Sequence, residues 1–456
     1  MVVMKFGGTS VESAEAIARV ASIVKARVDR KPVVVVSAMG KTTNKLLGIA
    51  NAAIIGKREA YLRQIHELRD FHSREARQVV PLAHRAELDR TLDDHFQDLT
   101  ELAKGLAILG ELTPRSIDAI SSYGERLSSY IVALAFEHYG LPAVHVDSRK
   151  VIVTDHRHTQ AAPIYGETYR RLESTIPRLA QDRVVVMGGF IGSTEDGVTS
   201  TLGRGGSDFT ASIVGAGIKA EEIQIWTDVD GMLTADPTIL PGGHRVKIIS
   251  FSEAAELAYF GAKVLHPSTV IPAIERDIPV LILNSRRPEV PGTRIVSQTV
   301  PCHNAVKSIA CKRRIMLVNI HSTRMLMAHG FLRRIFEVFD RHETPVDMVA
   351  TSEVSVSLTI DNTAQTKRIC EELSEFSEVS MEPDQAIVCL VGENIRYTPG
   401  VASRVFHALG DVNVRMISQG ASLLNLSVVV AEKDLRRAVE ALHEEFFSEL
   451  DPEVFE

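Results

Sequence analysis

Short runs of β-branched residues recur along the first two-thirds of the chain, and each is followed by glycine or polar residues before a helical stretch. Four such runs are Met1–Met4, Val33–Val36, Val184–Met187 and Ile223–Trp226. Ser10 is expected to cap a helix in which Ile17, Val20, Val24 and Val28 have helical spacing. Apolar strands that alternate with helices are typical of a parallel sheet covered on both faces. The sequence therefore predicts a three-layer α/β domain with a mainly parallel sheet.

The last third of the chain repeats itself. Gly330–Phe336 (GFLRRIF) resembles Gly400–Phe406 (GVASRVF), 70 positions later. Each copy predicts a strand, a glycine turn, an amphipathic helix and two further strands. The proline- and glycine-containing stretch Ser285–Thr293 marks a domain edge before the repeat. We predict a large domain over residues 1–290, followed by two βαββ modules over residues 300–380 and 381–456.

The composition argues against several classes of protein. The net charge is −7, so no basic field indicates nucleic-acid binding. The longest charge-free stretch, Met416–Ala431, is shorter than the roughly 20 residues of a transmembrane helix and contains polar residues, so no membrane partner is expected. The segment Met1–Gly8 has no secretory pattern. We expect a cytoplasmic protein.

The cysteines and the N-terminal histidines do not have the spacing of metal ligands. The cysteines are widely scattered, at Cys302, Cys311, Cys370 and Cys389. We predict free thiols and no metal site built from protein ligands. The histidines of a charged helical region, His66, His72, His84 and His95, are predicted to lie on solvated helix faces.

Glycine-rich segments at the strand ends are the candidate functional site. Gly7-Gly8 follows Lys5 at the end of the first strand, and Ser37–Gly40 follows the second strand, with Thr43 close by. The densest glycine loop is Thr201–Asp208. Backbone N–H groups near helix N-termini bind anions, and ligands of open α/β sheets bind at the carboxyl ends of strands. Together with the charged residues, this pattern favours transfer of a phosphoryl group from a polyphosphate.

Five longer stretches of the chain carry a resemblance to a known family. They are Lys5–Ser10 (KFGGTS), Ser122–Ser128 (SYGERLS), Thr201–Asp208 (TLGRGGSD), Trp226–Val229 (WTDV) with Asp236-Pro237, and Phe260–Pro267 (FGAKVLHP). In this order they resemble the aspartokinases over the whole chain. The resemblance implies an amino-acid-kinase domain followed by two ACT modules, and it is strongest to the monofunctional, lysine-sensitive bacterial type.

The resemblance also implies roles for residues around the reacting groups. Lys5 would neutralise charge on the phosphoryl group in transfer, and Asp208 would organise this lysine. Arg204 would hold the α-carboxylate of aspartate, and Glu125 would contact its α-ammonium group. Ser37 and Thr43 would donate hydrogen bonds nearby.

The nucleotide contacts that the resemblance implies come from several segments. They are Lys5, Gly7, Gly8, Thr227, Asp228, Leu233, Lys263 and Val264. Leu233 replaces a frequent aromatic residue and Thr238 a frequent arginine, so the adenine pocket is expected to differ in shape. ATP would bring Mg²⁺, held mostly by phosphate oxygens and water.

The effector site that the resemblance implies lies in the first ACT module. Its residues would be Met325, Gly330, Val346, Asp347, Ser352 and Glu353. Met327 and Ala328 replace His and Ser of related chains, so threonine rivals lysine as the effector. Pairing of ACT modules implies a homodimer or a higher homo-oligomer.

The expected function is therefore feedback-controlled phosphorylation of L-aspartate by ATP, an early step toward lysine, threonine and methionine. Two alternatives stay open at this point. One is a kinase for glutamate or N-acetylglutamate. The other is a catalytically inactive amino-acid sensor, against which the combination of Lys5, Arg204 and Asp208 argues.

Overall fold

The computed structural model describes residues 1–261, 267–323, 329–361 and 363–456. The chain forms two compact units, the first built from residues 1–231 and 267–298, the second from residues 232–261 and the described part of 299–456. The domain limits predicted from the sequence stay a prediction.

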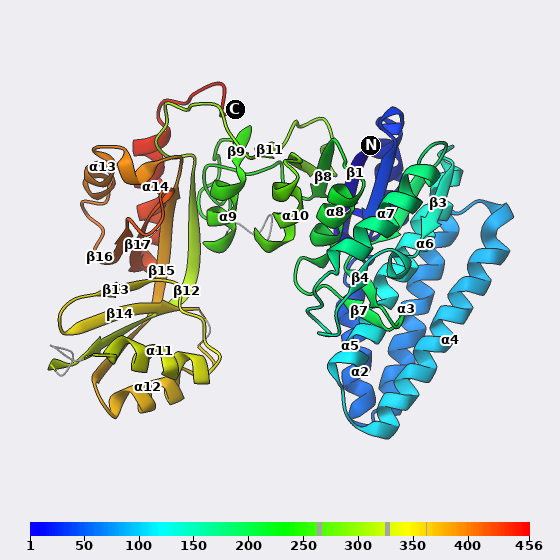
Figure 1. The fold of residues 1–456 in the computed structure, drawn as a ribbon, viewed down its shortest axis with the longest axis horizontal. Coiled ribbons are helices and arrows are strands. Elements are labelled where there is room, and N and C mark those ends of the chain that lie inside the picture. Colours follow the sequence, from blue (N-terminus) through cyan, green and yellow to red (C-terminus); the bar gives the residue numbers. More distant parts are fainter. Residues whose placement is uncertain (262–266, 324–328, 362) are drawn as a thin grey trace. The chain divides into compact units, whose positions relative to one another are not determined.

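A mainly parallel sheet is the centre of the first unit (Figure 1). Its strands, in spatial order, are β3 (Ala143–Val146), β5 (Val184–Gly188), β2 (Pro32–Val36), β1 (Val2–Phe6), β8 (Glu222–Thr227), β10 (Val280–Asn284) and β11 (Thr293–Val296). Only the pairing of β11 with β10 is antiparallel among the pairings in this series. Residues of β1, β2 and β5 are buried throughout, as the apolar runs predict. The mainly parallel α/β fold class is confirmed.

Helices surround this sheet and extend beyond it. They are α1 (Ala14–Lys25), α2 (Thr42–Ile54), α3 (Arg58–Val79), α4 (Arg85–Leu109), α5 (Pro114–Ser121), α6 (Tyr123–His138), α7 (Tyr165–Leu179), α8 (Gly206–Gly217) and α10 (Ile271–Glu275). Helices α2, α3 and α4 pack side by side and project from the sheet (Figure 1). A small second sheet holds β4 (Val153–Thr154), β6 (Ile191–Thr194) and β7 (Thr199–Thr201).

Several local expectations in this unit were wrong. Val28 lies beyond the end of α1, in a short 3₁₀ turn, and is 44% exposed. Ser13, not Ser10, caps α1, since its hydroxyl accepts a hydrogen bond from the Ala16 N–H at 3.2 Å. Ser10 lies in a short 3₁₀ turn, and its hydroxyl contacts that of Ser285 at 2.8 Å. His72 is fully buried rather than solvated, and burial lowers its pKa to about 4. Its Nδ1 lies 2.8 Å from the Leu68 carbonyl oxygen.

The second unit contains the tandem repeat. Its elements are β9 (Ile248–Ser250), α9 (Phe251–Tyr259), β12 (Ser308–His321), α11 (Phe331–Arg341), β13 (Val349–Thr351), β14 (Ser355–Ile360), α12 (Thr366–Ser374), β15 (Glu378–Val391), α13 (Val401–Ala408), β16 (Val414–Gln419), β17 (Asn425–Ala431) and α14 (Leu435–Phe447). One antiparallel sheet has the order β13-β14-β12-β15-β17-β16, so the first strands of the two copies pair at its centre. The repeat therefore folds into two similar halves of one sheet.

The core of the first repeat lies between its strands and its helices. Ile335, Val338 and Phe339 of α11 pack with apolar residues of β12 and β14, below which Figure 1 shows α11 and α12. The four cysteines are free thiols. Among the residues that the structure describes, none of the helices combines the length and apolar character needed to cross a bilayer.

Candidate active site

The carboxyl ends of β1, β2 and β5 meet at one edge of the main sheet because these strands are parallel neighbours. A cavity of about 260 Å³ opens there. Its lining residues are Lys5, Ser37, Thr43, Glu125, Phe190, Gly203, Gly205, Gly206, Ser207 and Asp208. Segments more than 200 residues apart in sequence thus provide one polar pocket, which is where open α/β sheets bind ligands.

Lys5 and Asp208 form an ion pair in this cavity. The Lys5 Nζ lies 2.7 Å from the Asp208 Oδ1, and both side chains are largely shielded from solvent. Lys5 is held by the buried strand β1, and Asp208 lies in the first turn of α8. The pair places a fixed cation beside a helix N-terminus whose N–H groups favour a bound anion.

Glu125 is the second acidic residue of the cavity. It lies in the first turn of α6, and its Oε1 accepts a hydrogen bond from the Ala38 N–H at 3.1 Å. Its Oε2 is buried and has no hydrogen-bond partner among the described residues. Burial raises the pKa of Glu125 from its usual 4.5 to about 8, against the opposing hydrogen bond from Ala38. The free acceptor oxygen suits a ligand that brings an N–H donor.

Two glycines allow the backbone to approach closely here. A Cβ at Gly188 would lie 3.0 Å from the Glu125 carbonyl oxygen, and one at Gly189 would lie 2.6 Å from the Ser207 Cβ. Phe190 follows with φ of +65°, a strained value for a bulky residue. The Ser37 hydroxyl donates to the Ser207 hydroxyl at 2.9 Å and so joins β2 to the glycine loop.

Arg204 is the one predicted substrate residue that does not line this cavity. It is exposed on the glycine loop between Gly203 and Gly205, both of which have positive φ and both of which line the cavity. Within the described parts of the chain it has no ion-pair partner. Its guanidinium group is therefore available to a ligand, at a position the free protein leaves open.

The glycine loop is held in place by Asp118, which sequence reasoning missed. The Asp118 carboxylate, 0% exposed, accepts hydrogen bonds from the Thr159 N–H at 3.0 Å and from the Thr201 hydroxyl at 2.5 Å, and it lies 2.7 Å from the His158 Nδ1. A Cβ at Gly203 would lie 3.0 Å from the Thr159 carbonyl oxygen. One buried carboxylate thus joins the two segments that border the loop.

Replacing Asp118 by Asn tests this structural role. The amide has one acceptor oxygen and places an NH2 donor where the second carboxylate oxygen was. We therefore expect a fall of about 2 kcal/mol in the free energy of unfolding, in the range for leaving buried donors unpaired. Urea denaturation measures the change. Asp196→Asn is the control, since Asp196 is exposed and, in the part of the chain that the structure describes, pairs with the exposed His156 at 3.2 Å. Equal stability of the two variants would contradict the role.

The predicted nucleotide residues fall into three groups. Gly7, Gly8, Thr227 and Asp228 lie at the same sheet edge as Lys5, since β8 is the other parallel neighbour of β1. The Gly7 N–H donates to the Trp226 carbonyl at 3.3 Å. Leu233 belongs to the second unit, where its carbonyl accepts from the Ser308 hydroxyl at 2.7 Å. Lys263 and Val264 lie outside the described residues.

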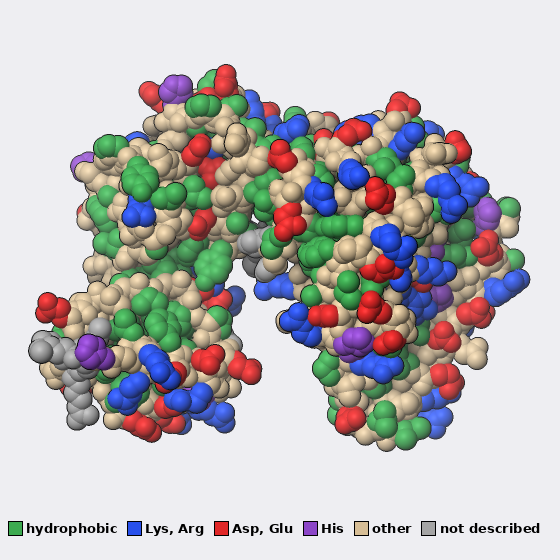
Figure 2. Space-filling model, in the orientation of Figure 1, with side chains coloured by type: hydrophobic (Ala, Val, Ile, Leu, Met, Phe, Trp, Pro, Cys, Tyr) green, Lys and Arg blue, Asp and Glu red, His purple; other side chains and the backbone are tan. Residues whose placement is uncertain are grey.

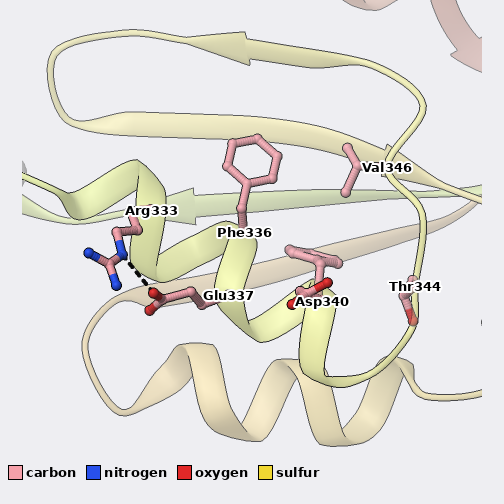
Figure 3. A pocket seen from close by; sticks show the side chains of 7 residues that line it. Arg333, Phe336, Glu337, Asp340, Thr344 and Val346 are labelled. Carbon is pink, nitrogen blue, oxygen red and sulfur yellow. Dashed lines mark hydrogen bonds and ion pairs between the residues drawn. The ribbon is translucent and has the colours of Figure 1, made fainter.

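The predicted effector residues are distributed over the first repeat. Gly330 is the N-cap of α11, with φ of +80°, and Val346 lines an open cavity of about 570 Å³ beside this helix (Figure 3). The Asp347 side chain is 4% exposed, whereas Ser352 and Glu353 are exposed after β13. Met325, and the substituted positions Met327 and Ala328, lie outside the described residues.

Sequence reasoning also missed Phe190 and Ser207 as cavity residues. The Gly188-Gly189 pair that precedes Phe190 is a signal that could have found it, because a glycine pair after a buried strand indicates a close backbone approach. Asp118 gave no such signal, since a single aspartate in a helix is most often a surface residue.

Two known protein families match parts of this chain. Residues 1–284 match the amino acid kinase family, and residues 388–446 match the ACT domain. The aspartokinase 2, chloroplastic, of Arabidopsis thaliana is 38% identical over 471 residues, covering 99% of this chain and 85% of the relative.

Two crystal structures of E. coli aspartokinase III have the same fold. The complex with lysine and aspartate (T-state) is 35% identical, with a TM-score of 0.85, and the match covers 98% of this chain and 99% of the other. The complex with aspartate and ADP (R-state) is 36% identical, with a TM-score of 0.81, covering 98% and 100%.

Proposed function

The chain belongs to the aspartokinase family, and we propose that it transfers the γ-phosphoryl group of ATP to the side-chain carboxylate of L-aspartate, giving 4-phospho-L-aspartate. The observation that carries this proposal is the Lys5–Asp208 ion pair, which shares one cavity with the unsatisfied Glu125 carboxyl group. The related structures with aspartate, and with aspartate and ADP, support it.

Lys5 carries the electrostatic part of the reaction. The attacking carboxylate of aspartate is ionised at neutral pH, so no general base is required. The barrier lies in bringing this anion to a charged phosphoryl group, and a fixed cation between the two offsets their repulsion. Asp208, at 2.7 Å, keeps the Lys5 ammonium group at the cavity wall until the substrates arrive.

The remaining cavity residues select the acceptor. Glu125 contacts the α-ammonium group of aspartate through its free Oε2, and Arg204 pairs with the α-carboxylate. Ser37 and Thr43 donate hydrogen bonds to the same ligand. An acceptor one methylene longer, such as glutamate, would displace its reacting carboxylate relative to Lys5.

The nucleotide is expected to bind at the carboxyl ends of β1 and β8, which are parallel neighbours. Gly7 and Gly8 present backbone N–H groups to its phosphates, and Thr227 and Asp228 contact the nucleoside, together with Leu233, Lys263 and Val264. Mg²⁺ comes with the nucleotide, held mainly by phosphate oxygens and water, as is usual for this ion. In the described parts of the chain no group of three or more His, Cys, Asp or Glu residues could hold a metal ion.

Inhibition by an amino acid, lysine first and threonine second, is the proposed function of the ACT modules. The lysine complex of the related E. coli enzyme supports this proposal. The proposed effector residues are Met325, Gly330, Val346, Asp347, Ser352 and Glu353. An effector inhibits by binding more tightly to a conformation with lower activity.

We also propose that the protein is a homodimer or a higher homo-oligomer that pairs through its ACT modules. Strand β13 lies at an edge of the sheet. Leu332 and Phe336 of α11 are about 40% exposed, and hydrophobic side chains gather on the surface near this helix (Figure 2). Figure 3 shows Phe336 standing above the helix, beside the open cavity. Exposed apolar side chains that gather on one surface favour association.

Replacing Phe336 by Asp should weaken this association at least tenfold, because a charge would enter an apolar contact. Analytical ultracentrifugation over a range of concentrations measures the effect. Ile108→Asp, at a residue 85% exposed on α4, is the matched control and should associate like the unmodified protein. An unchanged association constant for Phe336→Asp would place the interface elsewhere.

We also propose that the protein is located in the cytoplasm. The four free cysteines support it, because the cytoplasm keeps thiols reduced.

Acceptor specificity is the test of the proposed reaction. ADP formation is measured with L-aspartate, L-glutamate and N-acetyl-L-glutamate as the only acceptors. We expect turnover with aspartate and at least 100-fold less with the others, since a site built for specific polar contacts rejects mismatched ligands strongly. Preferred turnover with glutamate or N-acetylglutamate would replace the proposed acceptor, and none with any acceptor would indicate a sensor.

A further inference from the structure

Four side chains of the second unit form a charged cluster that the proposed reaction does not use. The Lys312 Nζ lies 2.7 Å from the Asp347 Oδ1 and 2.8 Å from the Asp361 Oδ2. The Tyr259 hydroxyl donates to the same Asp347 oxygen at 3.4 Å, and the Lys312 Nζ lies 5.5 Å from the centre of the Tyr259 ring. One ammonium group is thus held by two carboxylates and faces an aromatic ring.

The cluster carries more negative charge than Lys312 alone neutralises. Two carboxylates and one ammonium group leave one negative charge in excess. The Asp347 side chain is only 4% exposed, and its Oδ2 has no hydrogen-bond partner among the described residues. Burial raises the pKa of Asp347, although the hydrogen bond from Lys312 opposes this change. An ionised carboxylate in such a place requires a cationic partner.

Two carboxylates beside an aromatic ring are also the groups that recognise a free alkylammonium ion. We propose that Asp347, Asp361 and Tyr259 form an ammonium-binding site, that Lys312 fills this site in the effector-free protein, and that an amino-acid effector must displace Lys312 to bind. This inference rests on the proposed feedback regulation and deepens it. Lys312 is then the residue that sets the effector concentration at which inhibition begins.

Lys312 is well placed to leave. It lies on β12 beside an irregularity, since the pairing of β12 with β15 shifts register between Lys312 and Ile315. Its side chain is 19% exposed, so the ammonium group can reach water by rotation of a flexible stem. The incoming ammonium group would replace the same contacts, so the exchange costs little electrostatic energy.

Tyr259 connects the ammonium site, in sequence, to a segment proposed to bind the nucleotide. It is the last residue of α9, and Lys263, a proposed nucleotide contact, follows four positions later in the chain. A ligand that changes the Tyr259–Asp347 contact acts on the C-terminal end of α9. The ammonium site is therefore continuous in sequence with the nucleotide segment.

The test uses the full-length protein with L-lysine as the probe and L-threonine in parallel. Lys312→Met removes the internal cation, and Asp361→Asn removes one of the two carboxylates. We expect Lys312→Met to lower the half-inhibitory lysine concentration about tenfold and Asp361→Asn to raise it about tenfold, with kcat unchanged in the absence of lysine. Titration calorimetry should show the same shifts in Kd, and it detects binding whether or not the protein turns over aspartate.

Arg313→Met is the matched control. Arg313 follows Lys312 on β12 and pairs on the surface with Glu432 at 3.0 Å. Its replacement by Met removes one positive charge, as Lys312→Met does. Its half-inhibitory concentration should equal that of the unmodified protein. Unchanged or weaker lysine binding by Lys312→Met would overturn the inference. If Lys312→Met does not fold, Asp361→Asn tests the inference instead. The Asp361 side chain is 41% exposed, so this variant is expected to fold. Unchanged lysine binding by Asp361→Asn would also overturn the inference.

Measuring lysine binding and aspartate phosphorylation separately distinguishes a failure of the ammonium site from a failure of the proposed reaction. Lysine binding that shifts as expected, in a protein that does not phosphorylate aspartate, would support the ammonium site and refute the reaction. Inhibition of an active kinase by lysine with no shift in any variant would refute only the ammonium site. If threonine alone binds, the same shifts are expected for threonine.

Discussion

Replacing Lys5 by Met should lower kcat for aspartate phosphorylation about 1,000-fold, with a much smaller effect on the KM for either substrate. Among the described residues the Lys5 ammonium group is the one lysine cation that lines the cavity, and Asp208 holds it at the cavity wall at 2.7 Å. Its charge matters most when negative charge develops on the phosphoryl group, so the loss appears in the transition state rather than in ground-state binding. Steady-state kinetics at saturating ATP and aspartate measures it.

Lys57→Met is the control for the loss of a lysine charge. Lys57 is exposed at the start of α3, outside the cavity. Its replacement by Met should leave kcat unchanged. Asp208→Asn gives a second comparison, since it keeps the shape and removes the partner charge of Lys5. We expect a smaller fall for Asp208→Asn than for Lys5→Met. A Lys5→Met enzyme with normal kcat would refute the electrostatic role of Lys5.

Replacing Glu125 by Gln should raise the KM for aspartate about 100-fold, while the KM for ATP stays nearly constant. The free Oε2 of Glu125 is a buried acceptor, and the amide that replaces it offers a neutral group to the aspartate ammonium. A hydrogen bond to a charged partner contributes about 2–3 kcal/mol, which corresponds to this change in KM.

The same residue predicts a pH dependence. Burial raises the pKa of Glu125 to about 8, so in the free protein at neutral pH it is largely protonated and must lose a proton to bind an ammonium group. The kcat/KM for aspartate should therefore rise as the pH approaches 8, and Glu125→Gln should lack this rise. Between pH 4.5 and 8 the folded state keeps a proton on Glu125 that the unfolded state releases. The contribution of Glu125 to the free energy of unfolding therefore falls as the pH rises from 4.5 to 8.

Glu137→Gln is the matched control for these measurements. Glu137 lies near the other end of α6, is exposed, and accepts from the Ala143 N–H at 2.9 Å. We expect its KM values and its pH profile to match those of the unmodified enzyme. A Glu125→Gln enzyme with an unchanged KM for aspartate would remove Glu125 from the binding site.

Much of the main sheet could be predicted because its signal is local. Val33–Val36 is apolar throughout, as a strand covered on both faces must be, and the structure has β2 at Pro32–Val36. The cap of α1 was harder, since Ser10 and Ser13 both precede the apolar pattern and only backbone geometry separates them. His72 was misplaced because the packing of α3 against α4 buries it, and this packing is not encoded in its immediate neighbours.

The site was predicted only as far as motifs reach. Lys5, Glu125 and Asp208 lie in stretches with a family resemblance, and the structure brings all three to one cavity. Asp118 lies outside the quoted stretches, and its role arises from contacts with Thr159 and Thr201, which come more than 40 positions later in the sequence. The cluster of Lys312 with Asp347 was also beyond sequence reasoning, because β12 and the segment before β13 meet only in the fold.

The most direct test of the proposed reaction is trapping its product. An acyl phosphate reacts with hydroxylamine to give a hydroxamate, so the purified protein is incubated with ATP, Mg²⁺, L-aspartate and hydroxylamine, with and without L-lysine. We predict aspartyl hydroxamate that requires ATP and aspartate, is suppressed by lysine, and is lost with Lys5→Met. Folded protein that binds ATP yet forms no hydroxamate from aspartate would contradict the account.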